Sequence, residues 1–310
     1  MNFTTIETIN EEIKNTPGKF IEYAEENYYK QINSVAKDIL KSNKHILLLS
    51  GPSGSGKTTT ALRIEGILEE AGIETHTISM DNYFLSNDKI VDVPLNADGT
   101  PDLESPYRLD IPLFKDHLQK LNTREEIAVP YFDFGTGTVT KYTPLKRKEN
   151  EIIIIEGIHA LNPLVTGSDA QIALRLYVSV RTRLKYGELI LHPRKIRLMR
   201  RLCRDYQFRG RKLNQIVDMF KAVSKGENLY ITPFKKHADF EVDTFLPYEV
   251  SLYGNYIINA LAEQSDEVFE SRQTYLELKP FLTAVDNIPI DLVPQTSLVR
   301  EFIGGSLFEY

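Results

Sequence analysis

Cysteine is almost absent from the sequence, with Cys203 alone among 310 residues, and tryptophan does not occur at all. A single cysteine excludes an internal disulfide and any metal site built on several thiolates, and it favours a reducing compartment. Long apolar runs are missing too, because no stretch approaches the roughly 20 residues of a membrane span. The N-terminus also lacks a basic start followed by an apolar run. We therefore expect a cytoplasmic protein.

The sequence also lacks an excess of positive charge, since it contains 37 lysines and arginines and 43 aspartates and glutamates, for a net charge of -6. Proteins that bind nucleic acids or membrane surfaces favour an excess of lysine and arginine, so we expect neither partner. The content of 42% apolar and 26% charged residues is that of a globular protein. A chain of this length accommodates one large α/β domain with appendages, or two domains.

The strongest local pattern covers residues 51–58, which fit G-x-x-x-x-G-K-[ST] at every fixed position. Its glycines let the backbone approach phosphate oxygens, Lys57 can reach the β and γ phosphates, and the Thr58 hydroxyl can ligate Mg²⁺. A buried strand at 45–50 and a helix at 58–71 flank this phosphate loop in the required order, which disfavours an ordinary glycine turn. The residues expected to bind the nucleotide here are Gly51, Ser53, Gly54, Ser55, Gly56, Lys57, Thr58 and Thr59.

Strands alternate with helices along the chain, which predicts a three-layer α/β domain with a parallel sheet. Further strands are expected at 74–80, 151–156, 170–180 and 239–245, and a β-ribbon at 127–141 with its turn at 135–137. Two helices, broken at 16–18, are expected before residue 44. Ligands of such sheets bind at the carboxyl ends of the strands, where Asp81, Glu156 and the phosphate loop all fall.

These strand-end carboxylates are candidates for chemistry beside a phosphate loop. Glu156 follows four isoleucines, and a carboxylate there can hold Mg²⁺ against phosphate oxygens, although it could also be a solvated strand end. Asp81 ends the strand beside the loop, where it can orient an acceptor hydroxyl and take its proton. An aspartate at this place serves equally well as a helix N-cap.

A cluster of arginines lies between residues 181 and 212, with spacings of three and four that predict several guanidinium groups on one helical face. Its members are Arg197, Arg200, Arg201, Arg204, Arg209 and Arg211. Such a density suits a lid that neutralises transferring phosphoryl oxygens. The alternatives are a solvated helix face or an RNA-binding stripe. Asp205, the overall acidity and the absence of interleaved aromatics count against RNA.

Aromatic side chains gather beside the same predicted strand ends. Tyr83, Phe84, Tyr131, Phe132 and Phe134 can line an apolar pocket for a flat acceptor, although aromatics on a ribbon belong more often to a core. The histidines are scattered along the chain and none pairs with a nucleophile in sequence. We assign the histidines no function.

Taken together, the motifs resemble those of the uridine kinase and phosphoribulokinase family, particularly uridine/cytidine kinases, over residues 44–263. They read GPSGSGKT at 51–58, ISMDNYF at 78–84, PYFDF at 130–134, IIEGI at 154–158 and RRLCRDYQFRGR at 200–211. The resemblance implies a P-loop kinase domain at 44–265, with a helical N-terminal appendage at 1–43. Residues 266–310 would form a C-terminal extension that packs on the core.

The resemblance also implies functions for individual residues. Asp81 would activate a ribose 5′-hydroxyl, and Thr58, Glu156 and Asp81 would surround the metal. Arg201, Arg204 and Arg211 would contact ATP, while Lys57, Arg204 and Arg209 would act with Asp81 in catalysis. The acceptor would contact Asp81, Tyr83, Phe84, Glu104, Phe132, Asp133 and Arg209. Glu104 falls where uridine kinases use an aspartate to hold the ribose 2′ and 3′ hydroxyls.

The sequence departs from this family pattern on the acceptor side. Uridine kinases carry a histidine and a basic residue after the Tyr-Asp-Phe element, whereas residues 135–140 read GTGTVT here. The family's tyrosine after the catalytic aspartate is shifted, with Phe84 at the matching place and Tyr83 one residue earlier. The groups that read the pyrimidine are therefore missing.

These observations lead to an ATP- and Mg²⁺-dependent kinase for the primary hydroxyl of a small acceptor, foremost the 5′-hydroxyl of a nucleoside. A P-loop kinase for a sugar phosphate or another small alcohol is the first alternative, motivated by the missing base readers. The second is an ATP-binding regulator without small-molecule kinase activity, motivated by the segments outside the family pattern. Asp81 and the lid arginines argue against such a regulator, and homo-oligomer formation stays open.

Overall fold

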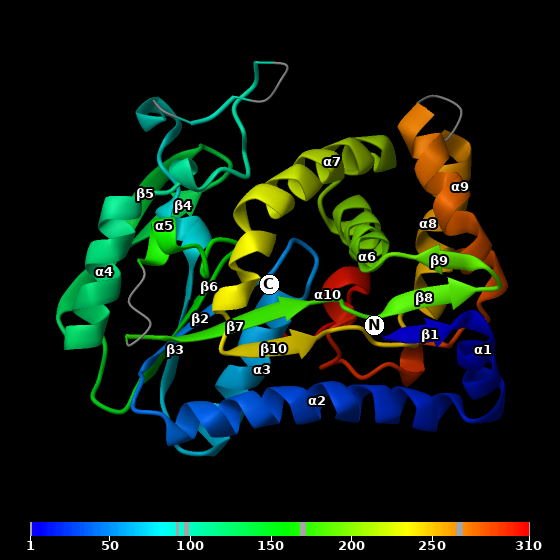
Figure 1. Cartoon of the computed structure of the whole chain (residues 1–310), viewed down its shortest axis with the longest axis horizontal. Coiled ribbons are helices and arrows are strands. Elements are labelled where there is room, and N and C mark those ends of the chain that lie inside the picture. The colour runs from blue at the N-terminus through cyan, green and yellow to red at the C-terminus, as the bar shows by residue number, and fades with distance from the viewer. Residues whose placement is uncertain (1, 91–92, 96–98, 168–171, 265–268, 310) are drawn as a thin grey trace.

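The computed structural model describes residues 2–90, 93–95, 99–167, 172–264 and 269–309 (Figure 1). Five strands form one parallel sheet in the order β10-β7-β2-β6-β3. Their bounds are β2 Ile46–Ser50, β3 Thr75–Ser79, β6 Ile152–Glu156, β7 Leu174–Ser179 and β10 Phe240–Asp243. The predicted strand at 170–180 begins with two residues that lie outside the described ones. The parallel sheet confirms the predicted α/β class.

Helices cover both faces of this sheet and make a three-layer domain. Along β2, Leu47 and Leu49 join one core, and Ile46 and Leu48 join the other. Because side chains alternate between the faces of a strand, an unbroken apolar run needs cover on both sides. The first core contains side chains of α2 Pro17–Lys41 and α3 Lys57–Glu70, and the second contains side chains of α4 Ile111–Thr123 and α5 Pro163–Thr166.

Two smaller sheets flank the domain. The ribbon of β4 Glu126–Asp133 and β5 Thr138–Lys146 is antiparallel and turns at the predicted residues, but it extends five residues beyond position 141. A second sheet joins β8 Arg183–Tyr186 to β9 Leu189–Leu191 and to β1 Phe3–Thr5. The N-terminal segment, which the sequence indicates is helical, therefore also contributes a strand.

The segment predicted to form an arginine-rich lid, residues 181–212, contains β8, β9 and α6 Pro193–Phe208. It is followed by α7 Leu213–Tyr230, and both helices lie above one end of the sheet in Figure 1. Helix α6 starts only at Pro193, because β8 and β9 occupy the preceding residues. It ends at Phe208, before Gly210 adopts a positive φ of 61°. Arg209 and Arg211 therefore lie in the connection to α7, while the other four arginines of the cluster lie on α6.

The remaining elements surround this framework. They are α1 Ile6–Asn15, α8 Val250–Gln264, α9 Phe269–Ala284, α10 Arg300–Ile303 and the 3₁₀ helices η1 Met80–Tyr83, η2 Asn87–Lys89, η3 Pro106–Arg108, η4 Thr232–His237 and η5 Ile290–Leu292. Residues 285–309, here called the tail, bring α10 back against α6, and Figure 1 shows α10 near the centre of the molecule. Within the described residues, none of the helices has the length and apolar character that crossing a membrane requires.

Candidate active site

The phosphate loop connects β2 to α3, so its amide groups lie at the N-terminus of a helix, where anions bind favourably. Gly54 and Gly56 have φ of 74° and 81°, a backbone region that glycine occupies without strain. A Cβ at Gly51 would lie 2.1 Å from the Val178 carbonyl oxygen. The loop is therefore packed against β7, and its three glycines are each required by the backbone or by a close neighbour.

Three arginines of α6 hold the loop from the lid side. Arg197 Nη1 donates to Ser53 O at 2.8 Å, and Arg200 Nη1 donates to Gly54 O at 3.2 Å. Arg201 Nη1 donates to Ser53 Oγ at 2.5 Å. The lid helix thereby supports the conformation of the loop.

Two of these arginines are paired with buried carboxylates from distant elements. Arg197 makes two bonds to Glu227 of α7, at 2.5 and 2.7 Å, and Arg200 makes two to Glu249, at 2.7 and 2.9 Å. Both arginines therefore position the loop and do not face a transferring phosphate. Sequence reasoning missed the two glutamates, because no local pattern marks either of them as a partner.

Asp205 forms ion pairs with four arginines, which are called the lid arginines here: Arg201, Arg204, Arg209 and Arg211. Ion pairs of 2.9 to 3.6 Å join it to all four side chains. Burial pushes the pKa of Asp205 up, but the arginines outweigh this effect and hold it below its usual range. Four cations around one carboxylate leave an excess of positive charge, which suits a site for phosphate oxygens.

Opposite the lid, the ends of β3 and β6 bring two carboxylates together. Ser79 lies beside Glu156 in the register, and Ser79 Oγ donates to Glu156 Oε1 at 3.0 Å. Ser79 also accepts from the backbone N–H of Asp81 and caps η1, so the Asp81 carboxylate is not used as the cap. The Asp81 side chain remains open to solvent, where an acceptor can reach it.

The charges around Asp81 and Glu156 shift the pKa values of these two carboxylates. Although Asp81 is accessible to solvent, the surrounding protein atoms partly desolvate its carboxylate and raise its pKa, while Lys57 and Arg209 lower it. Burial also raises the pKa of Glu156, which Lys57 lowers and Asp81 raises further. Lys57, Asp81 and Glu156 are therefore close enough to interact across one site, as the sequence pattern predicts.

Glu104 reaches the same site from the segment before η3. It packs so closely on α7 that a Cβ at Gly226 would lie 2.2 Å from the Glu104 Cβ. Burial raises the pKa of Glu104, and Arg201 is the first charge that opposes this effect. Glu104 thus lies between the lid and the acceptor side of the site.

Arg108 is a nearby cation that the sequence analysis did not consider. Its guanidinium lies 5.2 Å from the centre of the Phe84 ring, and its buried Nε has no hydrogen-bond partner among the described residues. Burial lowers the pKa of Arg108 and the Glu104 charge opposes that effect, so the two side chains are electrostatic neighbours. No motif marked this arginine.

The aromatic residues do not all line the acceptor side. Tyr83 is buried, and its hydroxyl bonds to His117 Nδ1 at 3.0 Å, inside the core beside α4. Phe84 and Phe132 have ring centres 5.6 Å apart, which leaves Phe84 with one face toward Arg108. Asp133 accepts from the Gly135 N–H and stabilises the ribbon turn. The structure therefore brings Phe84 to the site, but not Tyr83 or Asp133.

The tail closes the other side of the phosphate loop, which sequence reasoning did not anticipate. A Cβ at Gly56 would lie 2.4 Å from Leu298 Cδ1. Glu301 of α10 accepts from Thr59 Oγ1 at 2.7 Å and lies 3.6 Å from Arg204. Thr59 therefore directs its hydroxyl to the tail.

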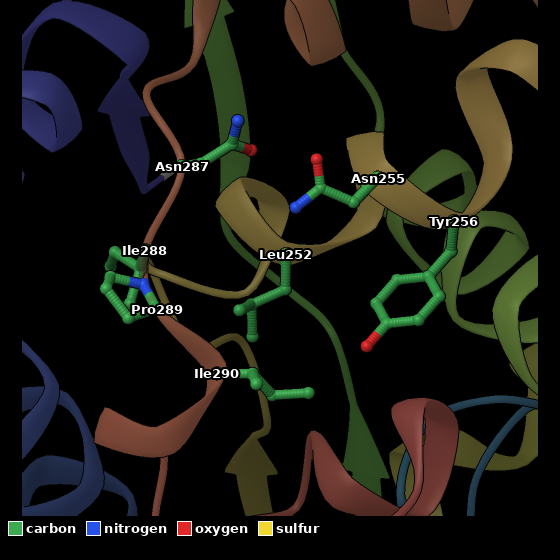
Figure 2. Close-up of a pocket in the computed structure, with 7 residues that line it drawn as sticks. All are labelled: Leu252, Asn255, Tyr256, Asn287, Ile288, Pro289 and Ile290. Atoms are coloured by element: carbon green, nitrogen blue, oxygen red, sulfur yellow. The ribbon is translucent and has the colours of Figure 1, made fainter.

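A separate cavity of about 380 Å³ lies between α8 and the tail. Figure 2 shows Leu252, Asn255 and Tyr256 on one side and residues 287–290 on the other. Its lining contains amide and apolar groups without a charged side chain. We assign this cavity no part in the chemistry of the phosphate loop.

Comparisons with known proteins show which family the chain resembles. The model of the Phosphoribulokinase / Uridine kinase family matches residues 46–248. A uridine kinase of Lactobacillus johnsonii is 31% identical over 208 residues, which cover 66% of this chain and 88% of that protein. A uridine kinase of Halobacterium salinarum is 27% identical over 192 residues, 62% of this chain and 76% of that protein. A solved structure described as a possible uridine kinase from Bacillus stearothermophilus has 18% identity and a TM-score of 0.46, covering 69% of this chain and 98% of that one.

Proposed function

The chain belongs to the phosphoribulokinase and uridine kinase family and is therefore an ATP-dependent phosphotransferase with an alcohol acceptor; we propose that its acceptor is the 5′-hydroxyl of a nucleoside. The observation that carries this proposal is the meeting of Lys57, Asp81 and Glu156 at the end of the phosphate loop. A hydroxyl placed beside Asp81 would lie between the Asp81 carboxylate, which can take its proton, and the γ-phosphate.

Asp81 acts on the acceptor. Its carboxylate orients the hydroxyl and takes the proton as the acceptor oxygen bonds to the γ-phosphorus and the bond to the bridging oxygen of ADP breaks. Lys57 stabilises charge on the β and γ oxygens, and Arg204 and Arg209 stabilise the transferring group. Glu104 accepts from the ribose hydroxyls, since a carboxylate has room for both.

The residues present fit a magnesium ion. Thr58 and Glu156 supply hard oxygen ligands, and the mutual repulsion of Asp81 and Glu156 would be relieved by a cation between them. Thr58 and Glu156 would hold the ion, which would supply positive charge that neutralises the phosphate oxygens of ATP. Among the described residues, no group of three or more histidine, cysteine, aspartate and glutamate side chains forms a metal site.

A second candidate acceptor is a small alcohol that carries a carboxylate or phosphate. The specific observation is Arg108, whose Nε has no partner among the described residues and which neighbours Glu104 on the acceptor side. An anionic group could bind this guanidinium in two-point fashion. The absence of base-reading residues at 135–140 is compatible with such an acceptor.

The test is an acceptor screen with Mg²⁺ and ATP, in which mass spectrometry detects a product that has gained one phosphoryl group. The panel holds nucleosides, sugar phosphates and hydroxy acids. With the acceptor found, Asp81→Asn should lower kcat by about 10²–10⁴-fold while ATP still binds. Asp88→Asn, an exposed aspartate of η2, is the matched control. Undiminished turnover by Asp81→Asn would show that Asp81 is not the base.

A further inference from the structure

A cavity of about 510 Å³ opens beside the phosphate loop, on the side that the tail covers. The phosphate loop and the lid form one wall with Thr58, Arg204, Phe208 and Arg209, and the tail forms the other, chiefly with Glu301 and Phe308. This volume lies within the range of roughly 300–1,000 Å³ that is usual for small-molecule sites. None of the carboxylates Asp81, Glu104 and Glu156 lines it.

The position of the cavity follows from the direction of a triphosphate in the loop. Lys57 reaches the β and γ phosphates, so the γ end faces Lys57, Asp81 and Glu156. The loop amides and the start of α3 hold the α and β phosphates, and the nucleoside must leave the loop away from Asp81. The cavity borders the start of α3 at Thr58, so it adjoins the helix N-terminus that holds the α and β phosphates.

The chemistry of the walls suits a nucleoside that follows a phosphate chain. Arg204 and Arg209 place positive charge where the phosphates would enter. Phe208 from the lid and Phe308 from the tail offer aromatic rings beside the backbone of Gly304 and Gly305. Aromatic side chains stack on nucleobases irrespective of base identity, with a contribution of about 1–3 kcal/mol per base.

The tail is held in place by contacts that reach the loop and the lid. Glu301 accepts from Thr59 and lies 3.6 Å from Arg204 of the lid. Within the tail, Arg300 donates to the carbonyls of Ile290 and Val293 at 2.8 and 2.6 Å. A Cβ at Gly304 would lie 2.8 Å from the Phe208 ring. The tail wall is therefore built against the lid helix and is no loose end of the chain.

We propose that the tail is part of the donor site, and that the nucleoside half of the nucleoside triphosphate binds in this cavity between Phe208 and Phe308. The inference rests on the proposed function, because it takes residues 51–58 as the donor phosphate site. It adds residues of the tail that lie outside the matched family segment 46–248. Glu301 positions the tail by its bonds to Thr59 and Arg204.

The experiment compares the binding of ATP and inorganic tripolyphosphate, each with Mg²⁺, by calorimetry of the full chain. Tripolyphosphate occupies the phosphate loop without filling the cavity. We expect Phe308→Ala to weaken ATP binding about 5- to 100-fold and to leave tripolyphosphate binding unchanged. Leu307→Ala is the matched control, since this neighbouring side chain is 66% exposed and does not line the cavity.

Each result has a definite meaning. An equal loss of ATP and tripolyphosphate binding in Phe308→Ala would show that the tail only supports the loop, and unchanged ATP binding would show that the base lies elsewhere; either overturns the inference. Kinase activity in the acceptor screen combined with one of these results would leave the proposed function standing. The expected selective loss, together with no phosphorylated product from any acceptor, would refute the proposed function and support the donor pocket.

Discussion

Arg200 of the lid helix and Glu249 before α8 form a two-point ion pair in which neither side chain has any solvent exposure. The same guanidinium donates to the carbonyls of Gly54 and Thr244, and the carboxylate accepts from Tyr253. One buried pair thus ties the lid, the phosphate loop and the chain between β10 and α8 together. Burial lowers the pKa of Arg200, but the Glu249 charge more than offsets this effect, so the arginine stays charged.

Breaking this pair should destabilise the protein strongly. Arg200→Met leaves the Glu249 carboxylate buried without its cation, and we expect a loss of about 3–5 kcal/mol in the free energy of unfolding. Urea denaturation measures it. Lys30→Met removes the exposed pair with Glu26 and should change stability by less than about 1 kcal/mol. A change as small for Arg200→Met would mean that the buried pair does not stabilise the fold.

The contact between Gly56 and the tail leads to a second prediction. Gly56→Ala and Gly72→Ala both place alanine at a φ near 80°, at a cost on the order of 1–3 kcal/mol. Only the first adds a Cβ against Leu298, a buried side chain without room to move, whereas Gly72 has nothing within 4 Å. Gly56→Ala should therefore cost roughly 1–3 kcal/mol more than Gly72→Ala. Equal losses in thermal unfolding would contradict the packing of the tail on the loop.

A third prediction concerns Glu156 and pH. Burial raises the pKa of Glu156 in the folded protein, so the folded state keeps this proton where the unfolded chain has released it. The free energy of unfolding then falls as pH rises above the ordinary glutamate value of about 4.3. Glu156→Gln should lose less stability than the wild type from about pH 4 to neutral pH. Exposed Glu126→Gln is the control, and parallel stability curves for Glu156→Gln and the wild type would refute the prediction.

The effect of substituting Arg108 distinguishes an anionic acceptor from a neutral nucleoside. If the acceptor carries an anionic group, Arg108→Gln should raise its KM about 10- to 100-fold, the value of a lost charged hydrogen bond of roughly 1.5–3 kcal/mol. For a neutral nucleoside the KM should stay nearly constant, and the KM for ATP should not change. Arg181→Gln, an exposed arginine paired with Glu241, is the matched control. An unaltered KM for an anionic acceptor would exclude Arg108 from its recognition.

Much of the site follows local sequence patterns. The phosphate loop could be predicted because eight consecutive residues and their flanking strand and helix define it. Asp81 and Glu156 could be predicted at one edge, because strands of a parallel sheet end on the same side. The positions of the aromatic side chains are harder to predict, since a ring such as that of Tyr83 can equally face a core or a pocket.

The phosphate loop and the strand-end carboxylates could be predicted because each depends on neighbours within a few residues, and the parallel sheet because strands alternate with helices along the chain. Which arginines are buried and what covers the loop depend instead on contacts between distant segments. Arg200 pairs with a glutamate 49 positions away, and Thr59 bonds to Glu301 across 242 positions. Such pairs are set by the packing of whole elements, whose geometry no short pattern records. The contact between the tail and the phosphate loop is of this kind, so no local pattern predicts it.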